Sequence, residues 1–152
     1  MKRILVSSDL SNRSDRAVER AVQLAEHPEH QGAKIILLHV IDDDLPADMI
    51  TQMRATANDI LTAVLTSEHA PETAEVVVET GPVVDTIVQF AQSIDPDLVV
   101  LGVHKPRPFW DMFVGTTMER VVRAMPYPVL LVTAPVAGPY TSLLCGIDLS
   151  PS

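Results

Sequence analysis

The chain has 152 residues, enough for one domain with its own core, and 47% of them are hydrophobic, which excludes a disordered protein. The net charge of −9 at pH 7 and the sequence pI of about 4.8 argue against binding of nucleic acid or of anionic membrane lipid. The single cysteine, Cys145, excludes an internal disulfide. No apolar run is long enough for a membrane helix or a secretory signal, so we expect a cytoplasmic protein.

Hydrophobic periodicity predicts strands and helices in alternation along most of the chain. The predicted strands are short apolar runs at residues 4–6, 35–41, 75–79, 98–101 and 129–132. Amphipathic segments between them predict helices, the first capped by Ser11 or Ser14 and the others starting at Ala47, Pro82 and Thr116. The helix from Ala47 to about His69 is expected to be amphipathic, with its apolar residues on one side: Met49, Ile50, Met53, Ala57, Ile60, Leu61, Val64 and Leu65.

This order of elements predicts an α/β fold, an open five-stranded parallel sheet with helices on both faces and right-handed crossovers. Ligands of such sheets bind beyond the carboxyl ends of the strands, where the strand order changes direction. The candidate positions at these ends are Ser8 and Asp9, Val40 and Ile41, Thr80 and Gly81, and Gly102.

The C-terminal residues 135–152 lie outside this unit, which we assign to residues 1–134. Residues 134–139 have the alanine-, proline- and glycine-rich composition of a linker. Residues 143–150, LLCGIDLS, then repeat the pattern of residues 4–11, ILVSSDLS. We therefore expect a tandem protein, with the present sequence ending just inside a second copy of the unit. The alternative is a chance similarity between two strand-turn starts.

The segment between the fourth strand and the next helix is unusually basic for this acidic chain. It contains His104 and Lys105, and it ends in Gly115, Thr116 and Thr117 where the helix starts. A glycine admits a phosphate close to the main chain, and a helix N-terminus attracts anions. This segment is therefore a candidate phosphate site, the alternative being a solvated loop with ordinary charges.

The sequence contains none of the common catalytic or nucleotide motifs. GxxxxGK[ST], GxGxxG, HExxH and GxSxG are absent, and the five histidines show no spacing typical of a metal site. His39 is most simply a strand-end residue, and no histidine can be assigned as a base to Ser7 or Ser8. We therefore predict no catalytic residues and no protein-bound metal.

Taken together, the pattern resembles the universal stress protein family from Lys2 to about Thr133. The matching features are Asp9 after the first strand, the motifs LHV at 38–40, GP at 81–82 and DLVVLG at 97–102, and the ending PYPVLLV at 126–132. Nucleotide-binding members carry glycine, two residues, glycine, nine residues, and then glycine with serine or threonine. In this sequence Gly102, Gly115 and Thr116 match that spacing, and Lys105 stands where the middle glycine belongs.

The resemblance implies a Rossmann-like sheet of the adenine nucleotide α-hydrolase type, with strand order 3-2-1-4-5. It also implies ATP or a related adenine nucleotide as ligand, alone or with Mg²⁺ or Mn²⁺ on its phosphates. The nucleotide would lie against Ser8 and Asp9, with the adenine near the main chain of Val40 and the ribose near Asp9 and Gly102. The phosphates would meet the loop and the helix start, at His104, Lys105, Gly115, Thr116 and Thr117.

Two functions therefore stay open. In the first, the chain is a stress-response protein that binds an adenine nucleotide and catalyses at most slow ATP hydrolysis. In the second, Lys105 and the prolines after it close the site, and the protein acts through dimerisation and protein partners. Both predict self-association, because the strand at 129–132 lies at a sheet edge in the family order and an apolar edge needs a partner. A homodimer or the second domain would supply it.

Overall fold

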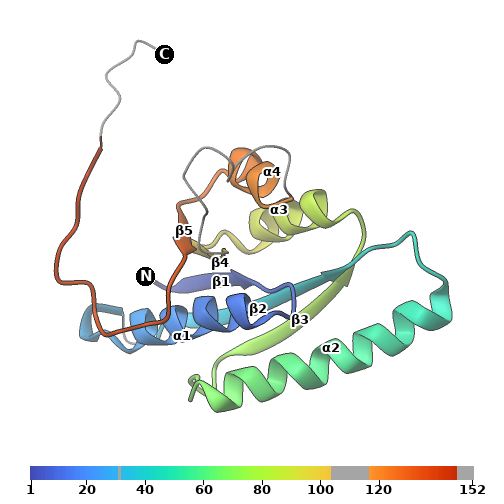
Figure 1. Ribbon diagram of the computed structural model, residues 1–152, viewed down its shortest axis with the longest axis horizontal. Coiled ribbons are helices and arrows are strands. Elements are labelled where there is room, and N and C mark those ends of the chain that lie inside the picture. Colours follow the sequence, from blue (N-terminus) through green and yellow to red (C-terminus); the bar gives the residue numbers. More distant parts are fainter. Residues whose placement is uncertain (31, 104–116, 147–152) are drawn as a thin grey trace, which may run out of the picture.

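The computed structural model of the chain describes residues 1–30, 32–103 and 117–146, in which strands and α-helices alternate (Figure 1). The short 3₁₀ helix η1 (Pro28–His30) follows the first α-helix. The other elements, in chain order, are β1 (Arg3–Ser7), α1 (Asn12–Glu26), β2 (Lys34–Ile41), α2 (Ala47–Ser67), β3 (Glu75–Thr80), α3 (Val83–Ile94), β4 (Leu98–Gly102), α4 (Thr117–Ala124) and β5 (Val129–Val132).

The five strands form one parallel sheet in the order β3-β2-β1-β4-β5. This confirms the predicted α/β class and strand order. The central strand β1 pairs with β2 on one side and with β4 on the other, so the strand order changes direction beside it. The carboxyl end of β1 is therefore where a ligand of such a sheet is expected.

Helices cover both faces of the sheet, α1 and α2 on one and α3 and α4 on the other (Figure 1). Successive side chains of β1 enter the two cores in turn. Ile4 and Val6 pack with α1 and α2, whereas Leu5 packs with α3 and α4, and all three are fully buried. The middle residues of the central strands are apolar because both of their faces are covered.

The predicted helix α2 is confirmed, and its apolar side is buried only in part. Ala57 and Leu61 are buried, and Ile50, Val64 and Leu65 pack partly on the core. Met49, Met53 and Ile60 are 38–46% exposed. The apolar residues of α2 span a wider arc than the sheet covers, because the helix lies along the β3 edge (Figure 1).

The segment predicted as a linker is held against α1. The guanidinium of Arg20, a residue only 6% exposed, donates to the Gly138 carbonyl at 3.0 Å and lies 4.1 Å from the centre of the Tyr140 ring. The Val136 N–H donates to the Glu19 carboxylate at 3.3 Å. Residues 141–146 form no strand with the sheet, so the second copy of the unit stays a prediction. No helix in the described part of the chain is long and apolar enough to cross a membrane.

Candidate functional site

A tight polar turn joins β1 to α1 and fixes the position of Asp9. The Ser8 hydroxyl accepts a hydrogen bond from the Leu10 N–H at 3.1 Å, and the Asp9 N–H donates to the Ser14 hydroxyl at 3.0 Å. Leu10 has a φ of 59°, a left-handed conformation that costs a non-glycine residue about 1–3 kcal/mol. The surrounding hydrogen bonds hold this strained turn, which places Asp9 at the carboxyl end of β1.

The Asp9 carboxylate uses its two oxygens unequally. Its Oδ1 accepts hydrogen bonds from the Ser11 N–H at 3.1 Å, from the Ser14 hydroxyl at 2.6 Å and from the Ser11 hydroxyl. Its Oδ2 accepts one bond from the Arg13 guanidinium, at 3.3 Å. Oδ1 thus has three donors within reach, more than the roughly two lone-pair sites of a carboxylate oxygen, whereas Oδ2 has one donor. Oδ2 can therefore accept one more.

The predicted cap of α1 is confirmed in its position at Ser11, but without the expected side-chain hydrogen bond. Ser11 occupies the N-cap position, yet its hydroxyl accepts no hydrogen bond from a main-chain N–H of the helix, and Ser14 lies within the first turn. Both hydroxyls donate to the Asp9 carboxylate, a charged acceptor that forms strong hydrogen bonds.

The environment keeps Asp9 ionised. Partial burial raises its pKa, but the hydrogen bonds from Ser11 and Ser14 and the charge of Arg13 together hold the pKa below its ordinary value of 3.8. Asp9 is therefore a carboxylate, and an acceptor, throughout the neutral pH range.

The main chain of Val40 points into the space beyond β1. The Leu38 carbonyl accepts a hydrogen bond from the Ser8 N–H on the β1 side, and the Ile41 carbonyl accepts one from the Gly81 N–H on the β3 side. Main-chain groups of successive strand residues point to alternate sides, so the N–H and C=O of Val40 face β1. The pairing of β1 with β2 ends at Leu38. The polar groups of Val40 thus lie at the edge of this space.

His39 was predicted to be a simple strand-end residue, and the structure gives it a specific contact. Its ring Nδ1–H donates to the Ser8 carbonyl at 2.9 Å. Because Nδ1 carries the proton, Nε2 is the acceptor nitrogen of the neutral ring. His39 thereby ties the end of β2 to the turn that carries Asp9.

Gly102 has a structural reason to be glycine. A Cβ at this position would lie 2.1 Å from the carbonyl oxygen of Arg13 and 2.9 Å from the nitrogen of Ser14. The first turn of α1 therefore packs directly on the end of β4. The family resemblance implied a ribose near Gly102, and the structure adds a packing reason for this glycine, because main chain occupies the space beside its Cα.

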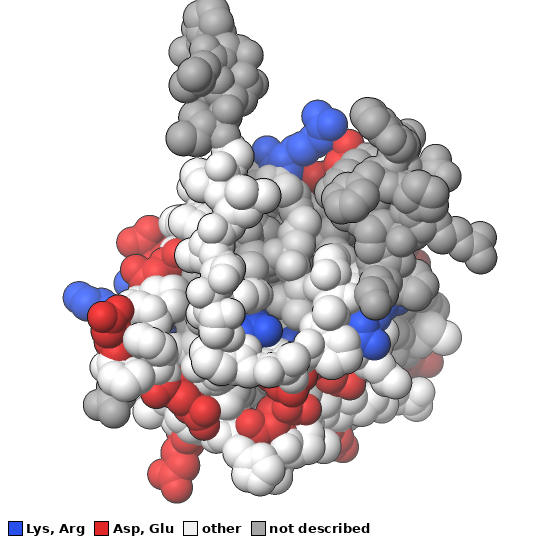
Figure 2. Space-filling view, turned by 60° about the vertical axis from the view of Figure 1, so that its left-hand side comes forward, with Lys and Arg blue, Asp and Glu red and all other residues white. Residues whose placement is uncertain are grey.

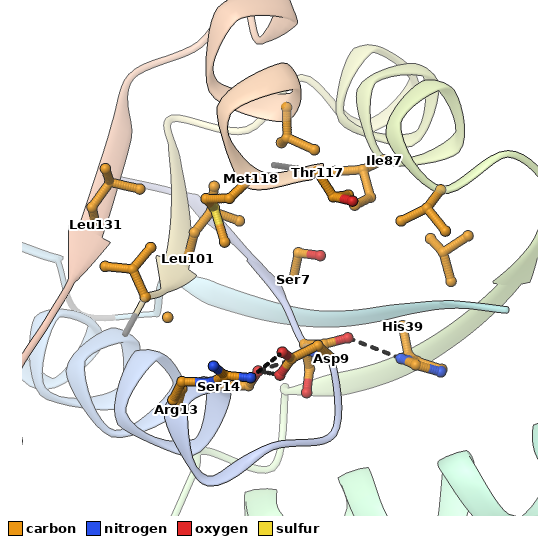
Figure 3. Close-up of a pocket in the computed structure, with 16 residues that line it drawn as sticks. Ser7, Asp9, Arg13, Ser14, His39, Ile87, Leu101, Thr117, Met118 and Leu131 are labelled. Carbon is orange, nitrogen blue, oxygen red and sulfur yellow. Dashed lines mark hydrogen bonds and ion pairs between the residues drawn. The ribbon is translucent and has the colours of Figure 1, made fainter. Parts of the chain in front are cut away.

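These groups border a cavity of about 550 Å³ at the carboxyl edge of the sheet (Figure 3). Its volume is within the range of pockets for small ligands. One side is polar and carries Asp9, Arg13, Ser14 and His39. The other is apolar and is formed by Val83, Ile87, Leu101, Met118, Val121 and Leu131.

Of the predicted site residues, five line this cavity: Ser8, Asp9, Val40, Gly102 and Thr117. His104, Lys105, Gly115 and Thr116 lie outside the described residues. Thr80 and Gly81 do not line the cavity, because β3 is an edge strand, two strands away from β1.

The sequence missed Arg13, Ser14 and the apolar wall. Arg13 follows Asp9 by four residues, and the turn that leads into α1 brings the two side chains together. That spacing was a usable signal. The apolar wall gave none, because its residues come from α3, α4, β4 and β5 and were predicted as ordinary core.

A smaller cavity lies beside the first and is acidic. It is lined by Asp42, Asp43, Asp44, Asp85 and Arg120, among others. The carboxylates of Asp42, Asp43 and Asp44 have oxygens within 4.8 Å of one another, but all three side chains are exposed. Exposed acidic groups of this kind are common, and we assign no metal to them.

Comparison with known proteins identifies the family. The family model described as "Universal stress protein family" matches residues 1–133. The chain belongs to the universal stress protein family. A search of curated protein sequences finds no match to it.

Solved structures of universal stress proteins share its fold. A universal stress protein in complex with cAMP is 27% identical, with a TM-score of 0.60 over 87% of this chain and 96% of that chain. UspA from Lactobacillus plantarum is 24% identical, with a TM-score of 0.69 over 86% of this chain and 97% of that one. A universal stress protein from Archaeoglobus fulgidus in complex with dAMP is 19% identical, with a TM-score of 0.65 over 86% and 97% of the two chains.

Proposed function

We propose that this universal stress protein binds ATP or a related adenine nucleotide in the cavity at the end of β1, with little or no catalysis. The proposal rests on one observation, that the groups suited to the base and to the ribose line the same cavity. The main-chain edge of Val40, the Asp9 carboxylate and an apolar wall all line one space of about 550 Å³. The cAMP complex of a relative 27% identical to this chain supports the choice of an adenine nucleotide.

The adenine base would lie between the apolar wall and the end of β2. Its faces are apolar and suit Val83, Ile87 and Leu101. Its exocyclic amine donates a hydrogen bond and the neighbouring ring nitrogen accepts one. The carbonyl and N–H of Val40 offer the complementary pair, which favours adenine over bases with the opposite pattern.

The ribose would be held by Asp9. Its Oδ2 can accept a hydrogen bond from a ribose hydroxyl, and the lowered pKa of Asp9 keeps the carboxylate charged at neutral pH. A hydrogen bond to a charged acceptor is roughly twice as strong as a neutral one. Ser8 and Gly102 would complete this part of the site.

The phosphates would extend towards α4, which starts at Thr117, where the helix N-terminus favours an anion. By family resemblance His104, Lys105, Gly115 and Thr116 would contact them, with Mg²⁺ or Mn²⁺ as counter-ion. The metal would supply charge neutralisation on the phosphates, and we propose no residue of this chain as a base for hydrolysis.

Self-association through β5 belongs to the same proposal. The Pro128 carbonyl accepts a hydrogen bond from β4, and the Val132 carbonyl accepts one from the Val103 N–H just after β4. The main-chain groups of Val129 and Leu131 therefore point away from the sheet. These groups and the half-buried apolar side chains of β5 would pair with β5 of a second copy, or with a second domain. Such pairing is also the basis of the second candidate function, in which the protein binds partners but no nucleotide.

Isothermal titration calorimetry with ATP and Mg²⁺ tests the nucleotide proposal. We expect binding by the unaltered chain and about tenfold weaker binding by Asp9→Asn, which replaces the accepting Oδ2 with a donor. Asp59→Asn on the exposed side of α2 is the matched control and should bind as the unaltered chain does. If the Lys105→Gly variant binds ATP and the unaltered chain does not, the second candidate function is favoured. If neither of these two proteins binds ATP, the first candidate function is overturned.

A further inference from the structure

Arg13 is a pocket residue that neither the family resemblance nor the proposed function uses. It lies in the first turn of α1, and its side chain lines the cavity beside Asp9 (Figure 3). Among the residues that the structure describes, it is the one lysine or arginine on the cavity wall. Its side chain is 43% exposed, so a ligand in the cavity can reach it.

The guanidinium of Arg13 keeps most of its donors available. Of its five N–H groups, the Nε–H donates to the Ser11 hydroxyl at 3.2 Å and one Nη2–H donates to Asp9 Oδ2 at 3.3 Å. Both contacts are at the long end for hydrogen bonds. Within the described residues the three remaining N–H groups, two of them on Nη1, have no hydrogen-bond acceptor. The group can therefore bind an anion without releasing Asp9.

The main chain that carries Arg13 is held firmly. Its carbonyl packs on Gly102, where even a Cβ would come within 2.1 Å of it. The next residue, Ser14, is 2% exposed and exchanges two hydrogen bonds with Asp9. The guanidinium thus projects from a fixed turn, next to the point where β4 ends at Gly102.

The guanidinium of Arg13 is a positive group in a strongly acidic protein. The chain carries a net charge of −9, and acidic side chains spread over the lower part of the face in Figure 2, where basic ones are few. The neighbouring cavity adds Asp42, Asp43, Asp44 and Asp85. A phosphate that enters from solvent is repelled by this field unless a positive group stands at the site. A guanidinium also matches two phosphate oxygens at once.

We propose that Arg13 makes this cavity select phosphorylated adenosine over adenosine itself. The inference rests on the proposed function, and it assigns Arg13 a direct contact with a phosphate group through Nη1. The Nη2 contact with Asp9 stays in place, so one pair of side chains serves both parts of the ligand. Asp9 accepts from the ribose, and Arg13 donates to the phosphate.

A different role for Arg13 would be to hold Asp9 in position. The two side chains form an ion pair four residues apart, and exposed pairs of this kind contribute little to stability. If Arg13 acted through Asp9, its loss would weaken the binding of ATP and of adenosine by the same factor, because both ligands carry the ribose. If Arg13 contacts the phosphate directly, its loss weakens the binding of ATP alone. The two roles are therefore separated by comparing the two ligands.

The test is calorimetry of the full chain with ATP and with adenosine, using four proteins. They are the unaltered chain, Arg13→Gln, Arg13→Lys and Arg16→Gln. Arg16 lies one turn further along α1 and does not line the cavity, so its variant removes the same charge from the same helix. We expect Arg13→Gln to weaken the binding of ATP about tenfold and the binding of adenosine less than twofold. Arg13→Lys should recover part of the loss, because it keeps the charge without the planar fork. Arg16→Gln should leave both affinities within about twofold.

Each outcome decides between these explanations. A larger loss for ATP than for adenosine in Arg13→Gln, absent in Arg16→Gln, supports the phosphate contact. Equal losses for the two ligands, or none, overturn it and leave the proposed function intact. Equal losses of ATP binding in Arg13→Gln and Arg16→Gln would also overturn it, because the effect would then be that of overall charge. An unaltered chain that binds neither ligand would overturn both the proposed function and this inference.

Discussion

Replacing Gly102 with alanine tests whether the end of β4 and the first turn of α1 form one packed unit. The added Cβ would meet the Arg13 carbonyl oxygen at 2.1 Å, its carbon at 2.6 Å and the Ser14 nitrogen at 2.9 Å. All three are main-chain atoms, so no side chain can rotate away and the helix must shift. Extra atoms in a packed core cost about 1–3 kcal/mol. The lower chain entropy of alanine returns about 0.5–1 kcal/mol, so the net loss is at most about 2.5 kcal/mol, and we expect about 1–2 kcal/mol because the atoms met are main-chain atoms.

Urea denaturation followed by far-ultraviolet circular dichroism measures this loss. For a chain of this length, about 1–2 kcal/mol corresponds to a fall in melting temperature of about 2–8 °C. Gly146→Ala is the matched control, because a Cβ there has no neighbour within 4 Å, and its stability should be unchanged. A Gly102→Ala chain as stable as the unaltered one would refute the packing argument and would return Gly102 to a role in ligand contact alone.

Three further changes give distinct readouts. The Asp97 carboxylate accepts the N–H groups of Lys2 and Arg3 at 2.5 and 2.9 Å, and these hydrogen bonds lower its pKa. The stabilisation that these hydrogen bonds give is therefore present above pH 3.8 and is lost as the pH falls further. Asp97→Ala should lower the urea midpoint at pH 7, and at pH 3 the midpoints of the variant and the unaltered chain should approach each other. Tyr140→Ala should lose about 0.5–1 kcal/mol of stability as its contact with the Arg20 guanidinium is removed, and Tyr140→Phe should lose none; equal losses would exclude the cation–π contact. If the chain dimerises through β5 as proposed, analytical ultracentrifugation should show a homodimer of the unaltered chain and a weaker one for Val129→Pro, which removes an outward N–H of β5, with unchanged circular dichroism; a monomeric unaltered chain or an equally strong dimer of the variant would exclude pairing through β5.

The sheet was predictable because its physical signals are local. Strands covered on both faces carry consecutive apolar residues, and β1, β2 and β4 contain such runs at residues 4–6, 35–38 and 98–101. The strand order followed from the family resemblance rather than from periodicity. Helix α2 shows the limit of local signals, since periodicity predicted the apolar side of the helix but not how much of that side the sheet edge would cover.

The site was predictable in its position and less so in its contacts. Asp9, Val40 and Gly102 could be named because the carboxyl ends of β1, β2 and β4 adjoin the change in strand order. The hydrogen bonds of Ser11 and Ser14 to Asp9 could not be predicted, because propensity indicates only that a serine at the start of a helix accepts from the helix N–H groups and does not show where its hydroxyl donates. The packing of Gly102 on α1 depends on tertiary contact and leaves no trace in the spacing of motifs.

Nuclear magnetic resonance of the isotope-labelled chain tests the central claim most directly, because it reports where a ligand binds as well as whether it binds. On addition of ATP with Mg²⁺, we predict that the largest amide shifts occur at Asp9, Val40, Gly102 and Thr117, which line one cavity. Met49 and Ile60 on the exposed side of α2 should not shift. Saturating ATP that leaves the four amides unmoved, or that shifts a different surface, would contradict the account.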